Sequence, residues 1–369
     1  MKRLSRMTAA AICLLVLLSG CGTADSPSSS PSPSPPLESS ITTAEPSAAL
    51  GEVTPALEIS KITTLEPDFS SANFSGNDGF EAFLTQGGAS SDMEVMEFLT
   101  KELLADVTIN SKSFGCSTLA VPTPDGHTLF GRNFDWQSCE ALVVTSKPAE
   151  GYASISTVNL DFISRTGGAL LAQDTALVLA ALYAPLDGMN EKGLAVSVNM
   201  IQDSANISQD TDKLDLTTTT AVRLLLNKAA NVEEALDLLG RYDLHGSMGM
   251  MIHFALADTT GRSVAVEYID NHMVITDAPV VTNFYLAEGD KHGIGTQQSH
   301  TRYDILTRAL AERPAMTMEE LRDAMDSVSK DNFNEFESTE WTAVFDLSSG
   351  EAHYYHRENY DNRFTFVLY

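Results

Sequence analysis

The order of elements expected along the chain predicts a mixed α+β fold, with two sheets that carry helices on their outer faces. An Asp-Gly turn joins two extended runs within residues 114–136, which is typical of a β-hairpin. Residues 217–242 carry two successive helical patterns. A strand meander over 250–276 precedes two more helices and the closing strands. Packing helices against both outer faces of two sheets buries all the apolar faces of such elements.

The chain begins with the pattern of a secreted lipoprotein. Three basic residues among the first six precede an apolar run from Ala9 to Leu18, and Leu-Ser-Gly-Cys at 18–21 has the form of a lipobox. The run is shorter than the ~20 residues that a spanning helix needs, so residues 1–20 are predicted to be a signal peptide. Lipid on Cys21 would then hold an extracytoplasmic protein at the bacterial cell membrane. An uncleaved anchor helix is the alternative.

Residues 21–60 are predicted to be a disordered tether that follows the lipidated Cys21. Ser, Pro, Thr, Ala and Glu dominate this stretch, and residues 26–36 consist only of Ser and Pro. This composition cannot bury enough apolar surface to form a core, and its prolines keep it extended. A proline-rich recognition motif is the other interpretation.

The chain is strongly acidic, with 23 Lys and Arg against 50 Asp and Glu, a net charge of −27. Removal of the signal takes away three positive charges, which gives −27 − 3 = −30. Such a surface repels nucleic acid, so no nucleic-acid partner is expected.

Cysteine and histidine usage argues against a disulfide scaffold and against a metal site. The four cysteines are Cys13, Cys21, Cys116 and Cys139, and loss of the first with the signal and lipidation of the second leave one possible pair. The eight histidines are scattered without zinc-ligand spacing. We therefore predict no metal and no cofactor.

Residues 61–115 are predicted to be a helical leader before a larger domain over residues 116–369. Ser91-Asp92-Met93-Glu94 has the pattern of a capping box. Apolar residues follow at helical spacing up to about Ala105, namely Val95, Phe98, Leu99 and Leu103. One amphipathic helix that packs against the following domain is expected.

The hairpin within 114–136 places a cysteine near charged residues. If Asp125 and Gly126 form a two-residue type I′ loop, opposed residue numbers sum to 251, and Cys116 faces Asp135. In that register Arg132 lies on the other face of the sheet and reaches the thiol only through a bulge, which we expect at Gly131.

A thiol flanked by an arginine and a carboxylate favours the thiolate, which is the reactive form. Cys116 is therefore a candidate nucleophile. The alternatives are a small buried apolar residue or one half of a disulfide with Cys139.

Cys116-Ser-Thr and Gly131-Arg132-Asn133-Phe134-Asp135-Trp136 resemble the opening of the choloylglycine hydrolase family of N-terminal-nucleophile (Ntn) amidases. This family includes bile-salt hydrolases, penicillin V acylases and related acid ceramidases and N-acylethanolamine acid amidases. In it a Cys begins the mature chain, with an Arg 16 and an Asp 19 residues further on, the positions of Arg132 and Asp135 here. The resemblance implies the four-layer αββα fold over most of residues 114–369.

Three later positions extend the resemblance. The turn over 190–194, Asn-Glu-Lys-Gly-Leu, leads to Asn199, and Val-Val-Thr-Asn-Phe-Tyr at 280–285 contains Asn283. In the family such asparagines bind the oxyanion. Arg302, in Ser-His-Thr-Arg-Tyr, matches an arginine that supports the charge of the nucleophile. Without the resemblance, Asn199 could simply bond nearby backbone and Arg302 could be a surface residue.

The resemblance implies a self-processing cysteine amidase. The thiol would attack the Gly115 carbonyl and cut the chain before Cys116, and Gly115 would help by tolerating backbone geometries closed to other residues. The freed α-amine, with a reference pKa near 7.7–8.0, would be the general base. Asp135 would orient that amine while Arg132 and Arg302 stabilise charge near the sulfur.

The expected substrate is a small N-acyl amide, and the chain could form an oligomer. Conjugated bile acids, phenoxyacetyl or fatty-acyl amides and acyl homoserine lactones are not separated by the sequence, although a leader before the nucleophile disfavours bile salts. Two other classes of function remain open. One is a lipid-anchored ligand-binding lipoprotein, and the other is a thiol peptidase in which His253 or His300 completes a Cys-His pair.

Overall fold

The computed structural model describes residues 58–103, 107–109, 114–165, 173–331 and 337–368. The predicted signal peptide, the predicted lipidation site Cys21 and nearly all of the predicted tether lie outside the described residues. Among the described helices, none is long and apolar enough to cross a membrane.

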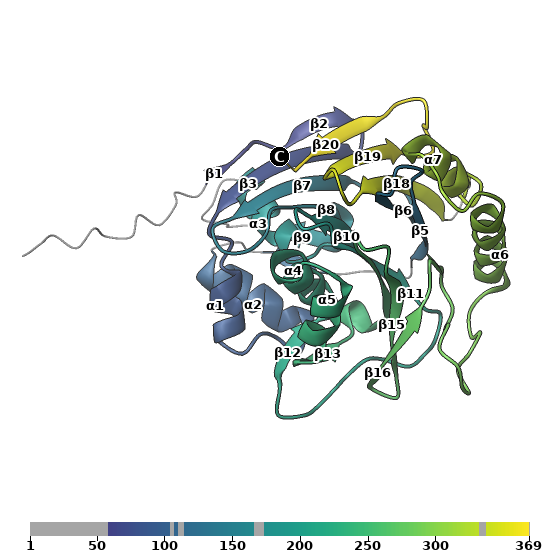
Figure 1. Ribbon diagram of the computed structural model, residues 1–369. Helices are drawn as coiled ribbons and strands as arrows, with labels where there is room; N and C mark the ends of the chain where they lie inside the picture. Colours follow the sequence, from purple (N-terminus) through teal and green to yellow (C-terminus); the bar gives the residue numbers. More distant parts are fainter. Residues whose placement is uncertain (1–57, 104–106, 110–113, 166–172, 332–336, 369) are drawn as a thin grey trace, which may run out of the picture. The chain divides into compact units, whose positions relative to one another are not determined.

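Two large sheets form the centre of the fold (Figure 1). The six-stranded sheet is antiparallel throughout, in the order β17 (Val280–Val281), β5 (Gly115–Pro122), β6 (Thr128–Trp136), β18 (Ser338–Asp346), β19 (Glu351–His356) and β20 (Phe364–Val367). The ten-stranded sheet runs β1 (Glu58–Ile59), β3 (Phe69–Gly76), β7 (Ala141–Pro148), β8 (Ser154–Asn159), β10 (Asp187–Asn190), β11 (Ala195–Met200), β14 (Ile252–Ala257), β15 (Ser263–Ile269) and β16 (His272–Asp277), with β2 (Thr63–Glu66) paired to β3. Two small ladders join β12 (Leu214–Thr217) to β13 (Tyr242–His245) and β4 (Val107–Ile109) to β9 (Ile163–Arg165).

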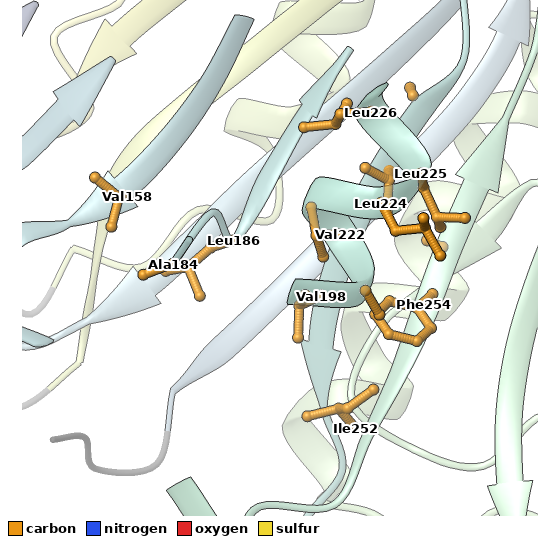
Figure 2. Packing of buried hydrophobic residues seen from close by; sticks show 14 of the residues in the cluster. Val158, Ala184, Leu186, Val198, Val222, Leu224, Leu225, Leu226, Ile252 and Phe254 are labelled. Atoms are coloured by element: carbon orange, nitrogen blue, oxygen red, sulfur yellow. The ribbon is translucent and has the colours of Figure 1, made fainter. Parts of the chain in front are cut away.

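Helices cover the outer faces of both sheets. The six-stranded sheet carries α6 (Gln297–Glu312) and α7 (Met318–Asp326). A separate cluster of buried apolar side chains fills the space between these helices and the sheet. The ten-stranded sheet carries α3 (Gln173–Leu182) and α4 (Thr218–Lys228), and α5 (Val232–Leu239) packs against α4 and β13. Figure 2 shows Val198, Val222 and Phe254 packed between α4 and this sheet. The predicted α+β class and the four-layer αββα arrangement are confirmed.

Local patterns define most of these elements correctly. Asn231 caps α5 by accepting from the Glu234 amide, and Thr317 with Glu320 forms the capping box of α7. The stretch 176–183, open between strand and helix from sequence, is helical up to Leu182 in α3, in keeping with its run of Ala and Leu.

The β5–β6 hairpin differs from the prediction by one residue. Pro124, Asp125 and Gly126 form a three-residue loop in which Gly126 has φ 92°, and the Thr123 amide donates to the His127 carbonyl. This is the type I turn followed by a left-handed residue that three-residue hairpins use. Opposed residues therefore sum to 250, so Cys116 pairs with Phe134 and Gly115 with Asp135. The β5–β6 ladder has no bulge at Gly131.

The leader is not only helical, which corrects the prediction for 61–115. The expected helix is present as α2 (Asp92–Glu102), with Ser91 accepting from the Glu94 amide, and α1 (Phe80–Thr85) precedes it. Residues 58–76 also supply β1, β2 and β3 to the ten-stranded sheet, where β3 runs parallel to β7. Strand pairing between segments so far apart leaves no local pattern in the sequence, which is why the helix alone was predicted.

Replacement of Phe69 tests whether strand β3 of the leader unfolds together with the rest of the core. Its side chain is fully buried, with ring centroids 5.0 Å from His356 and 5.2 Å from Phe364. Phe69→Ala should lower the free energy of unfolding in urea by about 3–5 kcal/mol because it leaves a cavity. Val367→Ala, at a side chain that is 51% exposed, is the control and should change it by no more than about 0.5 kcal/mol. Equal midpoints for both variants would mean that β3 unfolds separately.

Candidate active site

The thiol of Cys116 lies between the two sheets. Cys116 is 0% exposed, and its Sγ donates to the Val198 carbonyl oxygen at 3.4 Å. Arg132 reaches the same carbonyl with Nη2 at 3.3 Å and places Nε 3.0 Å from Oδ2 of Asp187. Because Cys116 opposes Phe134, Arg132 shares the thiol's side of the sheet in regular alternation, so the bulge expected at Gly131 is unnecessary.

Asp135 lies on the other face of the same hairpin, beneath α6. Its Oδ2 accepts from Nη1 of Arg302 at 2.6 Å, and its Oδ1 accepts from the Thr339 hydroxyl at 2.8 Å. Nη1 of Arg302 also donates to the Ser117 hydroxyl at 2.8 Å. Lys330 adds a second cation, with Nζ 3.7 Å from Oδ2 of Asp135. Arg302 is therefore a buried partner of the site and not a surface arginine.

Asn283 contacts both the nucleophile strand β5 and Arg302 beneath α6. Its Oδ1 accepts from the Cys116 amide at 2.8 Å and from Nη2 of Arg302 at 2.7 Å, while its Nδ2 donates to the Met200 carbonyl at 2.6 Å. The Nδ2 of Asn199 donates to the Val281 carbonyl at 3.3 Å. With the chain continuous through β5, both asparagine amides donate to backbone, so their oxyanion roles stay predictions.

The surroundings of Cys116 raise the pKa of its thiol. Burial has the largest effect and raises the pKa of the Cys116 thiol, while Arg132 lowers it through its charge and a hydrogen bond. Asp135 raises the pKa slightly further and Arg302 lowers it, and the result stays above the ordinary value of the thiol. The expectation that nearby charges favour the thiolate is therefore wrong for the continuous chain, because desolvation outweighs Arg132.

Gly115 lies in a crowded place. It is not among the residues with positive φ, so the predicted need for an unusual backbone geometry is wrong. A Cβ at this position would stand 2.8 Å from Nζ of Lys330 and 3.1 Å from Oδ2 of Asp135. Glycine thus allows the charged groups to approach the backbone next to the candidate scission point.

Two alternatives for Cys116 fail on geometry. Cys116 and Cys139 are both free thiols, so the disulfide is excluded. The ring nitrogens of His253 lie 3.1 Å from Oε1 of Glu267 and 2.8 Å from the Thr282 carbonyl, and Nε2 of His300 lies 2.9 Å from the Gly293 carbonyl. Neither histidine is a hydrogen-bond partner of the thiol in the described contacts, which removes the support for a Cys-His peptidase.

His253 and Glu267 instead hold the segment that carries Asn283. His253 contacts the carbonyl just before Asn283, and Glu267 accepts from the amides of Leu286 at 2.8 Å and Ala287 at 2.6 Å. Both side chains are fully buried. Sequence reasoning missed Glu267, and it missed Asp187 beside Arg132; a charged residue inside an otherwise apolar strand, as in β15, was the available signal.

The described residues contain no group of three or more His, Cys, Asp or Glu side chains that could hold a metal ion.

Glu267→Gln tests the support of the Asn283 segment. Burial is the largest effect and by itself would raise the pKa of Glu267, but His253 and the two amides together hold it below its ordinary value. A lowered carboxyl pKa adds stability that is present above the ordinary value of about 4.3 and is lost as pH falls through the lower folded value. The variant should lose about 2–4 kcal/mol of unfolding free energy at pH 7.

Urea unfolding of the Glu267→Gln variant and of the unchanged protein, measured between pH 7 and pH 3, checks this prediction. The difference between Glu267→Gln and the unchanged protein should shrink below pH 4. A difference that stays constant over this range would contradict the ionised state of Glu267. Glu288→Gln, at an exposed carboxylate nearby in the chain, is the control and should show little difference at any pH.

The chain and its fold are similar to known proteins. Residues 180–361 match the family model described as acyl-coenzyme A:6-aminopenicillanic acid acyl-transferase. A search of the curated proteins finds no match.

Three similar solved structures cover 69% of this chain. A cysteine variant of conjugated bile acid hydrolase from Clostridium perfringens is 18% identical with a TM-score of 0.52, and 92% of its chain is covered. Penicillin V acylase from Agrobacterium tumefaciens is 19% identical with a TM-score of 0.51, and 86% of its chain is covered. An arginine variant of the Clostridium perfringens enzyme is 17% identical, with a TM-score of 0.52 and 92% coverage. The family match over residues 180–361 and the shared fold confirm the resemblance found in the sequence.

Proposed function

We propose that the chain is a self-processing cysteine amidase that hydrolyses linear carbon-nitrogen amide bonds of small N-acyl compounds. One observation supports this most strongly. Asn283 accepts from the Cys116 amide, and it joins Arg302 and Asp135, from distant segments, in one hydrogen-bonded chain beside the peptide unit between Gly115 and Cys116. Burial of charged and amide side chains costs free energy, so their concentration beside this one backbone position favours a chemical role.

The proposed first reaction is cleavage of the chain before Cys116. Sγ of Cys116 forms a bond to the Gly115 carbonyl carbon, the carbon-nitrogen bond breaks, and the thiol proton passes to the nitrogen, which leaves a thioester and a free α-amine. Water then adds to the thioester carbonyl, and the carbon-sulfur bond breaks. The products are a Gly115 carboxylate and a regenerated Cys116 thiol. A smaller chain from Cys21 to Gly115 and a larger one from Cys116 to Tyr369 result.

Turnover of the substrate repeats this chemistry with the α-amine as general base. The amine stands at the end of β5 beside Asp135, the residue that Gly115 paired with before cleavage. It accepts the thiol proton as sulfur attacks the substrate carbonyl and returns it to the departing amine. Arg132 and Arg302 stabilise the negative charge near sulfur, and Asn199 and Asn283 turn their amides to the oxyanion. Water then releases the acyl group from Cys116.

The names of the similar structures support the substrate class. A conjugated bile acid hydrolase and a penicillin V acylase, by those names, act on small molecules with an acyl group in amide linkage. For this chain we propose a small N-acyl amide as the substrate.

The proposed location is the outer side of a bacterial cell membrane. The signal pattern over 1–20, the lipobox Cys21 and the Ser- and Pro-rich stretch up to residue 60 support a lipid anchor with a tether. Substrate would then reach the enzyme from outside the cell.

Cys116→Ala tests the nucleophile. Purified residues 22–369 should separate into two chains, the larger of which begins Cys-Ser-Thr-Leu, whereas the variant should remain a single chain. The variant should also lose at least about 10³-fold in the rate of N-acyl amide hydrolysis, because nothing replaces the attacking sulfur. Intact mass, N-terminal sequencing and an amine-release assay measure these outcomes.

Cys139→Ala is the matched control, since Cys139 is the other buried free thiol and should not affect cleavage. If the unchanged chain stays uncut at both mildly acidic and neutral pH, the self-processing proposal fails. If the Cys116→Ala variant is still cut, another group of the protein or a contaminating protease performs the cleavage.

Thiol labelling tests whether cleavage before Cys116 makes its thiol accessible to a reagent in solution. Cys116 is 0% exposed and its raised pKa disfavours the thiolate, so iodoacetamide should leave it unmodified in uncut chains. In cut chains from the same preparation it should react, while Cys139, which is 3% exposed, should stay unmodified in both. Peptide mass mapping of the two fractions reports the result. Equal labelling of Cys116 in both fractions would refute the link.

A further inference from the structure

A buried lysine lies next to the peptide bond that the proposed reaction cuts, and no step of that reaction uses it. Lys330 follows α7, and its side chain is only 4% exposed. A Cβ built on Gly115 would stand 2.8 Å from Nζ of Lys330, which puts the ammonium over this end of β5. Along the bonds from that Cβ position to the Cys116 nitrogen, the two nitrogens are at most about 7 Å apart.

Hydrogen bonding to Asp135 does not account for the position of Lys330. Oδ2 of Asp135 already accepts from Arg302 at 2.6 Å, and its Oδ1 accepts from the Thr339 hydroxyl at 2.8 Å. Nζ of Lys330 is 3.7 Å from Oδ2, beyond ordinary hydrogen-bond length, so it acts on this carboxylate through its charge. Its direct partner is Glu337, whose side chain is 17% exposed. Lysine is rarely buried this deeply, and a pair with Glu337 alone does not need burial.

The backbone of Lys330 is anchored to the strand that also holds Asp135. The Lys330 amide donates to the Thr339 hydroxyl at 2.9 Å, and the Thr339 amide donates to the Lys330 carbonyl at 3.0 Å. The same hydroxyl donates to Oδ1 of Asp135. One residue of β18 therefore fixes both the lysine and the carboxylate beside Gly115.

The α-amine formed by the proposed cleavage would meet charges from several elements. Asp135 of β6 pairs with Gly115 and favours the ammonium form, in which the amine cannot accept the thiol proton. Two cations on the same face, Arg302 of α6 and Lys330, oppose this effect. Further charged groups near this cluster are Glu337 beside Lys330, Glu358 near Asp135, and Arg132 with Asp187 on the side of the thiol.

Resting on the proposed amidase function, we propose that Lys330 keeps the α-amine of Cys116 in its neutral, proton-accepting form. A positive charge a few ångströms from an amine makes protonation of that amine less favourable. Asp135 can then orient the amine without also holding a proton on it. Because Lys330 acts through the amine, it is a positioning residue, and Glu337 weakens its effect by pairing with it.

The pH dependence of kcat/KM in the cut enzyme measures the protonation of the amine. Activity falls on the acidic side as the base takes up a proton, and the midpoint of this acidic limb reports the pKa of the base in the free enzyme. Acetyl, octanoyl and hexadecanoyl amides of aminomethylcoumarin serve as fluorogenic substrates. The amide that the unchanged enzyme hydrolyses fastest is then used for every variant.

Variants that change one charge at a time should move the limb in opposite directions. Lys330→Met should move it to higher pH by about one pH unit, because the amine then holds its proton more firmly. Lys330→Arg keeps the charge and should leave the limb near its original place. Glu337→Gln removes an anion and should move the limb to lower pH by about half a pH unit. In the double variant the two shifts should largely cancel.

Lys228→Met is the matched control. Lys228 is also a partly buried lysine paired with a glutamate, Glu81, but it lies at the end of α4, which packs on the ten-stranded sheet. Its replacement should leave the acidic limb unchanged.

The outcomes separate this proposal from the proposed function. If the cut enzyme hydrolyses none of the amides in a Cys116-dependent way, the proposed function fails. If it does, and Lys330→Met lowers kcat/KM equally at every pH, Lys330 has only a structural role and this proposal is overturned. If Lys330→Met does not cut itself, Glu337→Gln decides, and an unmoved limb in that variant overturns the proposal. Failure of both variants to cut themselves also overturns it, because the pair then serves cleavage or folding.

Discussion

The register of the β5–β6 hairpin is the constraint on which the site depends. Gly126, at φ 92°, makes the loop three residues long, so the strand after it is shifted by one position from a two-residue turn. A shift of one residue turns every side chain of a strand to the opposite face. Arg132 therefore lies with the Cys116 thiol between the sheets, and Asp135 lies with Arg302 beneath α6. Charged groups thus reach one stretch of β5 from both of its faces.

Burial of these charges is costly, and the fold offsets the cost by pairing each of them. Arg132 and Asp187 are both fully buried, and their ion pair is completed by the Trp341 indole. Removing one partner would leave an unpaired buried charge, which costs several kcal/mol. The same exclusion of water raises the pKa of the Cys116 thiol. Under the proposed function, the reactivity of the thiol is therefore coupled to the departure of the leader end that excludes the water.

The leader has two parts with different physical roles. Its strand β3 (Phe69–Gly76) is hydrogen-bonded in parallel to β7 and carries core side chains, so it is part of the same folded unit as the candidate site. Its last residues, Phe114 and Gly115, instead occupy the space beside the nucleophile. A cut before Cys116 can release the second part without breaking the pairing of the first.

The sequence by itself determined what depends on short-range patterns and on motif spacing. These are the α+β class, most of the order of strands and helices after residue 115, the helix caps, and Cys116, Arg132 and Asp135 as candidate site residues. Only the tertiary structure decided the hairpin register, the membership of the leader strands in the large sheet, and the pairing of Arg132 with Asp187. It also decided that burial outweighs the cation at the thiol. The reason is that these features arise from contacts between residues far apart in the chain, 55 positions for Arg132 and Asp187, and from the exclusion of water, which no local pattern encodes.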